Sequence, residues 1–188
     1  MGYFPAFLKL DNKKILIVGG GVIAHEKLLH LLDFTTDIVI VAKELSDAML
    51  QTIAEYELHY EKRAYKEGDI EGFFVVVVAV DAIALQKSIY EECQKSPTLC
   101  NAVDATAYCD FIFPSYIKKG DLTVAVSTSG ASPAVAKHLR RYLQEMIPDT
   151  IISFLEEMKG LRKILPKGKE RMKMFDEKAK KYIESWRR

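Results

Sequence analysis

The chain has 188 residues, of which 49% are hydrophobic and 28% charged, and its formal net charge is +1. These values are ordinary for a soluble globular protein with one medium-sized domain and an appendage. The longest apolar run, residues 73–80, is too short to span a bilayer, so we expect no membrane association. Three cysteines without C-x-x-C spacing argue against a disulfide framework or structural zinc and favour the reducing cytoplasm.

Hydrophobic patterning over the first hundred residues predicts strands that alternate with helices. Residues 73–80 are apolar on both faces, as in a central parallel strand, whereas residues 58–65 alternate as in a strand near an edge. This order predicts a Rossmann-type α/β fold, a doubly wound parallel sheet that binds ligands beyond the carboxyl ends of its strands. The predicted strands are 14–18, 37–42, 58–65, 73–80 and 98–103, and the predicted helices are 22–32, 46–56 and 82–95.

The pattern changes after Asp104. Residues 110–117 and 122–128 predict an antiparallel β-hairpin, and Ser132-Pro133 predicts the N-cap and first position of a helix that runs to Met146. Two more helices are predicted over 149–164 and 168–187. We therefore expect three parts, namely a Rossmann domain over residues 1–109, a hairpin and helix segment over 110–147, and a small helical domain over 148–188.

The residues Ile15–Ala24 form a short apolar run that breaks into three glycines. In Gly19-x-Gly21-x-x-Ala24 the first glycine allows a tight turn, and the second lets the backbone approach a pyrophosphate. The small third residue lets helix and strand pack closely, and the helix N-terminus presents unpaired N–H groups to the anion. The alternative is a turn that only packs the sheet, but the position between a strand and a helix favours a dinucleotide site.

The second predicted strand ends where NAD-binding folds usually carry an acidic residue for the adenosine ribose. Glu44 is the nearest carboxylate and lies one or two residues late, whereas Lys43 would suit a 2′-phosphate. The choice between NAD and NADP stays open on this evidence. The candidate cofactor-binding residues are Gly19, Gly20, Gly21, Val22, Ile23, Ala42, Lys43 and Glu44.

Asp104 follows the last predicted strand of the sheet. This position places its carboxylate near the nicotinamide half of a bound cofactor, where it would take a proton while a hydride leaves the substrate. A turn or capping aspartate is the alternative. Asp104 is our candidate catalytic residue.

A hydroxyl-rich loop over residues 127–133 leads into a helix N-terminus, and converging hydroxyl and N–H groups suit a carboxylate or phosphate. Helix capping explains Ser132 and Pro133 but not the further hydroxyls. The four histidines show no metal-ligand spacing, so no fixed metal site is predicted. The candidate substrate-binding residues are Ser127, Thr128, Ser129, Gly130, Ser132 and Lys137.

The charge is distributed unevenly. Residues 159–188 hold twelve Lys or Arg and four Asp or Glu, an excess of eight positive charges, so residues 1–158 carry a net charge of −7. A basic C-terminal segment would attract an anionic ligand or nucleic acid, although a solvated helix face is the commoner explanation. No nucleic-acid-binding motif accompanies it, and we expect no nucleic-acid partner.

These motifs resemble the precorrin-2 dehydrogenase/sirohydrochlorin ferrochelatase family, the oxidising and metal-inserting module of siroheme synthases. The resemblance covers residues 3–145 in order, and the region beyond is similar only as a small helical domain. The motifs after residue 100 indicate this family much more specifically than the glycine motif does. The matching blocks are Phe4-Pro5-x-Phe7-Leu8-x-Leu10 running into Ile15–Ala24, Asn101-x-Val103-Asp104 with Phe111-x-Phe113-Pro114-Ser115, and Val124–Pro133.

The resemblance implies two reactions at one site. NAD⁺ takes a hydride from precorrin-2 to give sirohydrochlorin, and Fe²⁺, a substrate, then replaces two pyrrole protons to give siroheme. In the family, the aspartate that matches Asp104 is the proton acceptor in both steps, and a transient contact with iron there is compatible with the absence of fixed metal ligands. The glycine turn would hold NAD, and the 127–133 loop would face the tetrapyrrole. The family dimerises through the segment after the Rossmann unit, which implies a homodimer through residues 110–146.

Some members of the family only dehydrogenate, and no residue separates the two classes. Lys43 also stands where the family commonly has proline. We therefore expect a cytoplasmic, NAD-dependent precorrin-2 dehydrogenase that also inserts Fe²⁺. A dehydrogenase without chelatase activity and a non-catalytic NAD(H)-sensing Rossmann module are the alternatives.

Overall fold

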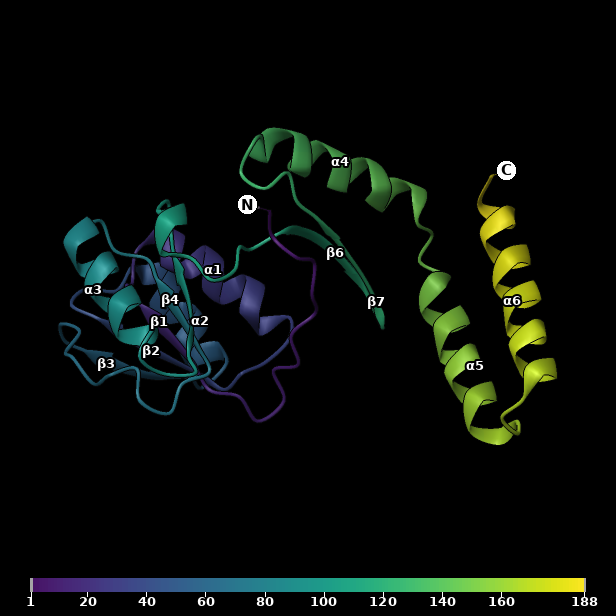
Figure 1. Ribbon diagram of the computed structural model, residues 1–188, viewed down its shortest axis with the longest axis horizontal. Coiled ribbons are helices and arrows are strands. Elements are labelled where there is room, and N and C mark those ends of the chain that lie inside the picture. Colours follow the sequence, from purple (N-terminus) through teal and green to yellow (C-terminus); the bar gives the residue numbers. More distant parts are fainter. Residues whose placement is uncertain (1, 188) are drawn as a thin grey trace. The chain divides into compact units, whose positions relative to one another are not determined.

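The computed structural model describes residues 2–187, drawn as a ribbon in Figure 1. The chain divides into two compact units, the first spanning Tyr3–Ile112 and the second beginning at Phe113. Each unit has a hydrophobic core of its own. Among the described residues, no helix combines the length and the apolar character needed to cross a membrane.

The first unit is built on a five-stranded sheet in the order β3-β2-β1-β4-β5, with every neighbouring pair parallel. The chain therefore winds outward from β1 in one direction and then returns to β4, beside β1, before winding the other way. This reversal between β1 and β4 is the point where doubly wound sheets bind their ligands. The strands are β1 (Ile15–Val18), β2 (Ile38–Ala42), β3 (His59–Lys62), β4 (Val75–Val78) and β5 (Leu99–Ala102), and the helices are α1 (Val22–Leu32), α2 (Asp47–Glu55) and α3 (Ile83–Cys93).

The predicted Rossmann-type α/β fold is confirmed. Every residue of β1 and β4 is buried, as the apolar run over 73–80 predicts, whereas three of the four residues of β3 are exposed at the sheet edge. Alternate residues of the central strands pack with α3, because side chains of a strand point to opposite faces in turn. Leu16, Val76 and Val78 form one layer with Ile89 and Cys93 of α3.

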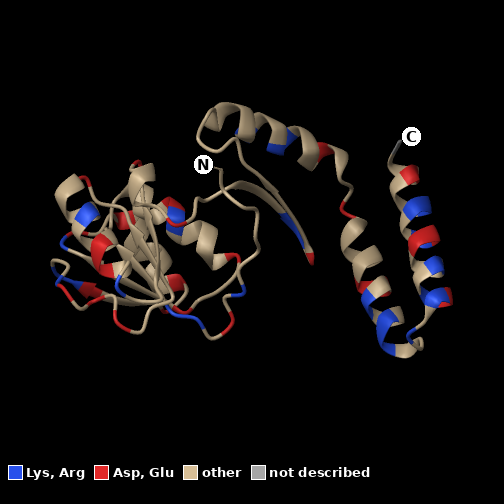
Figure 2. Ribbon diagram, viewed as in Figure 1, with Lys and Arg blue, Asp and Glu red and all other residues tan. Residues whose placement is uncertain are grey.

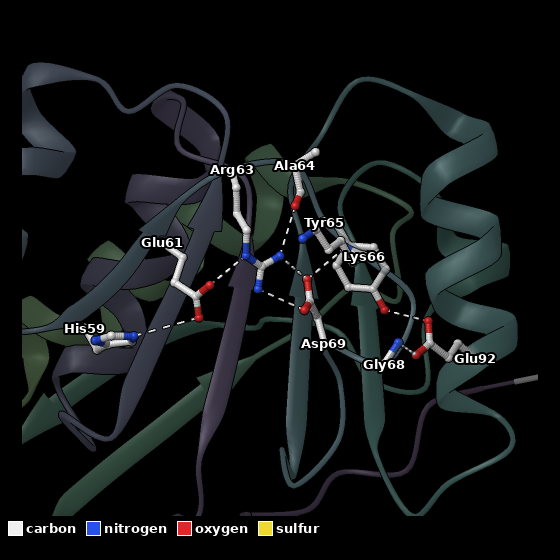
Figure 3. Close-up of polar contacts among 9 residues, drawn as sticks. All are labelled: His59, Glu61, Arg63, Ala64, Tyr65, Lys66, Gly68, Asp69 and Glu92. Atoms are coloured by element: carbon white, nitrogen blue, oxygen red, sulfur yellow. Dashed lines mark hydrogen bonds and ion pairs between the residues drawn. The ribbon is translucent and has the colours of Figure 1, made fainter.

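The connection from β3 to β4 carries no helix and is held instead by a polar network, shown in Figure 3. The Arg63 guanidinium donates from Nε to Glu61 at 2.6 Å and from Nη1 and Nη2 to the Asp69 carboxylate at 2.6 and 2.9 Å. Burial acts to raise the pKa of Asp69, but the hydrogen bonds from Arg63 outweigh it and lower that pKa. Tyr65 donates to Glu92 of α3 at 2.6 Å, which ties the connection to the helix. The Arg63 contacts order the connection itself, and the separate Tyr65–Glu92 contact attaches it to α3.

The segment after β5 departs from the prediction, which began a strand at residue 110. Residues 110–114 are irregular, and the strand β6 begins at Ser115. The cause is that Asp110 folds back onto β5, where its backbone N–H donates to Cys100 O at 2.8 Å and its carboxylate accepts from the Cys100 N–H at 2.8 Å. A short 3₁₀ turn, η1 (Thr106–Tyr108), precedes this contact.

The second unit contains the predicted antiparallel hairpin and three helices. The Ser132 side chain accepts from the Val135 N–H and Pro133 is the first helical residue, as expected. Ile117, Ile147 and Ile151 form a small core between hairpin and helices. Its elements are β6 (Ser115–Lys119), β7 (Leu122–Val126), α4 (Pro133–Met146), α5 (Ile151–Ile164), α6 (Lys169–Glu184) and the 3₁₀ turn η2 (Ser185–Arg187).

Basic residues gather along the end of α5 and along α6, as Figure 2 shows. Several of them have structural partners within the unit. Lys159 pairs with Asp121 at 3.0 Å, Lys178 pairs with Glu157 at 2.7 Å, and Arg171 donates to the Leu165 carbonyl at 2.9 Å. Some of the basic side chains of α5 and α6 therefore stabilise the packing of the second unit through ion pairs and hydrogen bonds.

Candidate functional site

The glycine turn joins β1 to α1 at the carboxyl edge of the sheet. Gly19 has a φ of +127°, and a Cβ atom there would lie 2.2 Å from the backbone oxygen of Ala79, just past β4. A Cβ atom on Gly21 would meet nothing within 4 Å. Ala24 is buried where α1 packs on the sheet. The positive φ and the close packing against the segment after β4 therefore require glycine at position 19. Gly21, in contrast, borders open space that a pyrophosphate could occupy.

The middle glycine is as constrained as the first. A Cβ atom on Gly20 would lie 2.2 Å from the backbone oxygen of Glu44 and 3.0 Å from Cβ of Ala42, and the Gly20 carbonyl accepts from the Ser46 N–H at 2.9 Å. The end of β2 is thus packed directly on the turn. Lys43 and Glu44 follow Ala42 with exposed side chains. The structure brings together all the predicted cofactor-binding residues of these two segments.

The first turn of α1 is open. Gly21 is its N-cap and supplies no capping side chain, and the first helical bond is donated by His25 N–H to Gly21 O. Such a helix end attracts an anion because its N–H groups and the helix dipole both favour negative charge. The Val22 side chain is 70% exposed, and Ile23 is exposed beside it. These groups fit a dinucleotide, whose pyrophosphate would face the N–H groups.

Asp104 lies just past β5 at the same edge of the sheet as the glycine turn, and its side chain is exposed. Its φ is +61°, in the left-handed region that non-glycine residues seldom adopt. The turn is closed by the Ala105 N–H, which donates to Ala102 O at 3.3 Å. An exposed carboxylate in a strained turn at this edge is available to a ligand bound at the switch point between β1 and β4.

Lys27 of α1 is a charged neighbour of this carboxylate. Burial lowers the pKa of Lys27, while the charges of Glu26 and Asp104 act in the opposite direction. Lys27 lies on α1, the helix that starts at the glycine turn, and its charge interacts with that of Asp104. The motif patterns did not single it out, since a lysine in the second turn of an amphipathic helix normally faces solvent.

Three polar residues around Asp104 were also not singled out as functional. Asn101 is buried on β5 and donates to Phe111 O at 2.8 Å. Gln86 of α3 is buried and donates to Val103 O, and the Cys109 thiol lies against the carbonyls of the same turn. Only Asn101 was visible in the sequence, as part of a motif. Gln86 and Cys109 could not be recognised in the sequence, because the tertiary fold determines which residues they contact.

The hydroxyl loop belongs to the second unit. Much of its hydrogen-bonding capacity orders the loop itself. Thr128 Oγ1 accepts from the Ser132 N–H and donates to Ser132 O, and Ser127 Oγ accepts from the Ser129 N–H at 3.0 Å. Ser129 and Gly130 have φ values of +52° and +86°, which turn the chain into α4. Lys137 is exposed on that helix. The loop is a formed turn whose outer surface, at Ser129 and Gly130, is exposed.

Within residues 2–187, no cluster of three or more His, Cys, Asp or Glu side chains is arranged to hold a metal ion. Cys93, Cys100 and Cys109 are free thiols.

The parallel sheet and glycine turn define an NAD(P)-binding protein of the Rossmann class. Residues 6–115 match the model of the family described as "Putative NAD(P)-binding", and the chain belongs to this family. Residues 119–146 match the model described as "Sirohaem biosynthesis protein central". Together these matches confirm the resemblance that the sequence motifs predict.

The chain is similar to curated siroheme synthases. It is 36% identical to siroheme synthase 1 of Serratia proteamaculans over 151 residues, which is 80% of this chain and 32% of that protein. It is 31% identical to the siroheme synthase of Pseudoalteromonas translucida over 175 residues, 93% of this chain and 36% of that protein. The chain thus spans about a third of the length of these relatives. Among solved structures, it is similar to SirC, precorrin-2 dehydrogenase, with a TM-score of 0.76 and 27% identity over 90% of this chain and 85% of that one.

Proposed function

We propose that this protein acts in siroheme biosynthesis as an NAD-dependent dehydrogenase that oxidises precorrin-2 to sirohydrochlorin. The observation that carries the proposal is that the glycine turn follows β1 and Asp104 follows β5 at the same edge of one parallel sheet. The likeness to SirC, precorrin-2 dehydrogenase, supports the substrate, and the siroheme synthase relatives support the pathway.

The residues at the turn fit NAD. The open position at Gly21 and the uncapped start of α1 would receive the pyrophosphate, and Val22 offers apolar surface beside it. Glu44 is held next to the turn by its backbone contact with Gly20. Its carboxylate would bind ribose hydroxyls and repel a 2′-phosphate, so NAD is proposed over NADP despite the neighbouring Lys43. When bound, NAD⁺ supplies the hydride acceptor.

In the oxidation, the substrate loses a hydride with its electron pair to the cofactor and a proton to a base. Asp104 is the proposed base, because its exposed carboxylate lies at the ligand-binding edge of the sheet. The Lys27 ammonium, whose charge interacts with that of Asp104, is a positively charged neighbour of the proposed base.

The second unit would bind the carboxylates of the tetrapyrrole. The formed turn at Ser127–Ser132 exposes Ser129 and Gly130, and Lys137 adds a positive charge one turn into α4. The proposed substrate-binding residues are Ser127, Thr128, Ser129, Gly130, Ser132 and Lys137.

The proposal extends to insertion of Fe²⁺ into sirohydrochlorin. Metallation releases two pyrrole protons, and the same exposed carboxylate, Asp104, would accept them one at a time and pass each to solvent. Fe²⁺ is a substrate in this step, and a transient contact with Asp104 is compatible with the absence of a metal-binding cluster among residues 2–187. The three free thiols support a reducing compartment, the cytoplasm.

We also propose that the chain forms a homodimer through the second unit. The apolar side chains of α4 are only partly buried within the unit: Leu143 packs on its core, whereas Leu139, Tyr142 and Met146 are exposed. Exposed apolar stripes of this kind mark protein interfaces. Light scattering should give a dimer mass for the wild type and a monomer mass for Tyr142→Asp, with Gln144→Asp as the matched polar control on the same helix.

The test of the activity is anaerobic incubation with precorrin-2 and NAD⁺, following NADH and the tetrapyrrole spectrum, and then addition of Fe²⁺. We expect NAD⁺-dependent sirohydrochlorin formation that Asp104→Ala abolishes or greatly weakens, with Asp81→Ala as the control because Asp81 is an exposed carboxylate that follows β4 at the same edge. Oxidation without accelerated iron insertion would identify a dehydrogenase alone. Absence of NAD⁺-dependent oxidation would favour a non-catalytic NAD(H)-sensing module.

A further inference from the structure

The turn at Asp104 needs support from outside itself. A non-glycine residue with φ near +60° is strained, and such a conformation persists only where surrounding contacts enforce it. The single backbone hydrogen bond that closes the turn, from Ala105 N–H to Ala102 O, is long at 3.3 Å. Two side chains from outside the turn contact its backbone.

Cys109 contacts the turn from the side of the following loop. Its Sγ lies 3.1 Å from Ala102 O and 3.4 Å from Ala105 O, so the thiol meets the carbonyls on both sides of Asp104. Burial raises the pKa of the Cys109 thiol, which keeps the proton on sulfur and makes it a hydrogen-bond donor. Asn101 holds the thiol in place, because its amide donates to Sγ at 3.6 Å and the two residues form an isolated antiparallel bridge.

Gln86 contacts the turn from α3. Its Nε2 donates to Val80 O at 2.6 Å and to Val103 O at 3.3 Å, so one amide group joins the segments that follow β4 and β5. Val103 is the residue before Asp104. Gln86 is only 3% exposed, and its Oε1 is buried without a hydrogen-bond partner among the described residues. A buried acceptor without a partner destabilises a fold, so an apolar residue would be the better choice if packing were the only role of this position.

We propose that Gln86 and Cys109 are positioning residues that hold the Asp104 carboxylate in its reactive orientation from two sides of the turn. The inference rests on the proposed role of Asp104 as the base. Neither residue is proposed to touch the substrate or the cofactor. Both act through the backbone of residues 102–105, and their loss would displace the carboxylate without removing it.

If Gln86 and Cys109 act only by positioning Asp104, their replacement should change kcat but not the binding of NAD⁺. Cys109→Ala and Gln86→Met should each lower kcat by about tenfold to a hundredfold, because small displacements of a reacting group reduce the rate on that scale. The KM for NAD⁺ should stay unchanged, since the glycine turn is not altered. Cys109→Ser keeps a hydrogen-bond donor and should recover most of the lost rate.

Thr98→Val is the matched control. Thr98 is buried and its hydroxyl donates to Phe73 O at 2.8 Å, which joins the segments before β4 and β5 at the opposite edge of the sheet. Its replacement removes a similar side-chain to backbone bond between the same strands but leaves Asp104 untouched. Thr98→Val should therefore lower thermal stability while kcat remains at the wild-type value.

The experiment measures kcat, KM and melting temperature for the full chain carrying each variant, and repeats Cys109→Ala and Gln86→Met in the Asp104→Ala background. We expect neither substitution to lower the residual rate of Asp104→Ala, because both act through the removed carboxylate. Wild-type kcat in both single variants would overturn the positioning role while leaving the proposed function intact. A loss of kcat in Thr98→Val equal to that in Gln86→Met would also overturn it. Wild-type turnover by Asp104→Ala would instead remove the catalytic assignment on which the inference rests.

Discussion

The backbone oxygen of Glu44 lies so close to Gly20 that a Cβ atom on Gly20 would be only 2.2 Å from it. The end of β2 and the turn after β1 are therefore packed backbone against backbone. This contact fixes the segment that carries the candidate ribose-binding carboxylate next to the segment that would hold the pyrophosphate. Gly20 thus links the two halves of the proposed cofactor site.

The first prediction concerns the stability of this contact. Gly20→Ala should lower the free energy of unfolding by about 1–3 kcal/mol, because the added methyl group meets backbone, which yields less easily than a side chain. Gly21→Ala should stay within about 1 kcal/mol of the wild type, because the space around Gly21 is open and its φ of −81° suits alanine. Urea denaturation of the two variants measures the difference. Equal stability of both variants would contradict the prediction.

The second prediction concerns binding at the same turn. Gly21→Asp should leave the fold intact but abolish NADH binding, because its carboxylate would occupy the open space that the pyrophosphate needs and would repel it. Titration of NADH fluorescence measures the affinity, and Gly21→Ala serves as the uncharged control. If Gly21→Asp bound NADH as tightly as the wild type, the cofactor would have to lie elsewhere.

The limits of the sequence as a guide are clear from these residues. The strands, the helices and the tight turn at Gly19 could be predicted because hydrophobic period and glycine spacing are local signals. The constraint on Gly20 could not be predicted, since it arises from a loop 24 residues later in the chain. Gln86 and Cys109 were missed for the same reason, because the carbonyls that they contact belong to other strands and turns. The hydroxyl loop was recognised in the sequence. That the hydroxyls of Thr128 and Ser127 order the loop itself could not be predicted, because it depends on the conformation of the loop.

The third prediction separates the fold from the chemistry at Asp104. Asp104→Gly should be more stable than Asp104→Ala by about 1 kcal/mol, because glycine adopts a φ of +61° without the strain that alanine would carry. Both variants should lose precorrin-2 oxidation, since neither has a carboxylate. Thermal unfolding and NADH formation measured on the same samples test both parts. An active glycine variant would show that the backbone of this turn, and not its carboxylate, supports turnover.

The fourth prediction is a dependence of stability on pH that arises from His30 on α1. Burial, and then the charge of Lys27, lower the pKa of His30 below its ordinary value of 6.5. Between the lowered value and 6.5, the unfolded chain binds more protons at this site than the folded chain. The contribution of His30 to the free energy of unfolding should therefore decrease as the pH falls through 6.5 and level off below the folded-state pKa.

The measurement is urea denaturation of the wild type and of His30→Gln at several pH values between 7.5 and 5. We expect the wild type to lose stability more steeply on acidification than His30→Gln, which has no proton to bind at this position. His59→Gln is the control, because His59 lies exposed on the edge strand of the same unit, and it should keep the steep dependence. Identical pH profiles for the wild type and His30→Gln would mean that other groups cause the loss of stability, and that the neutral state of His30 is not required for packing α1 on the sheet.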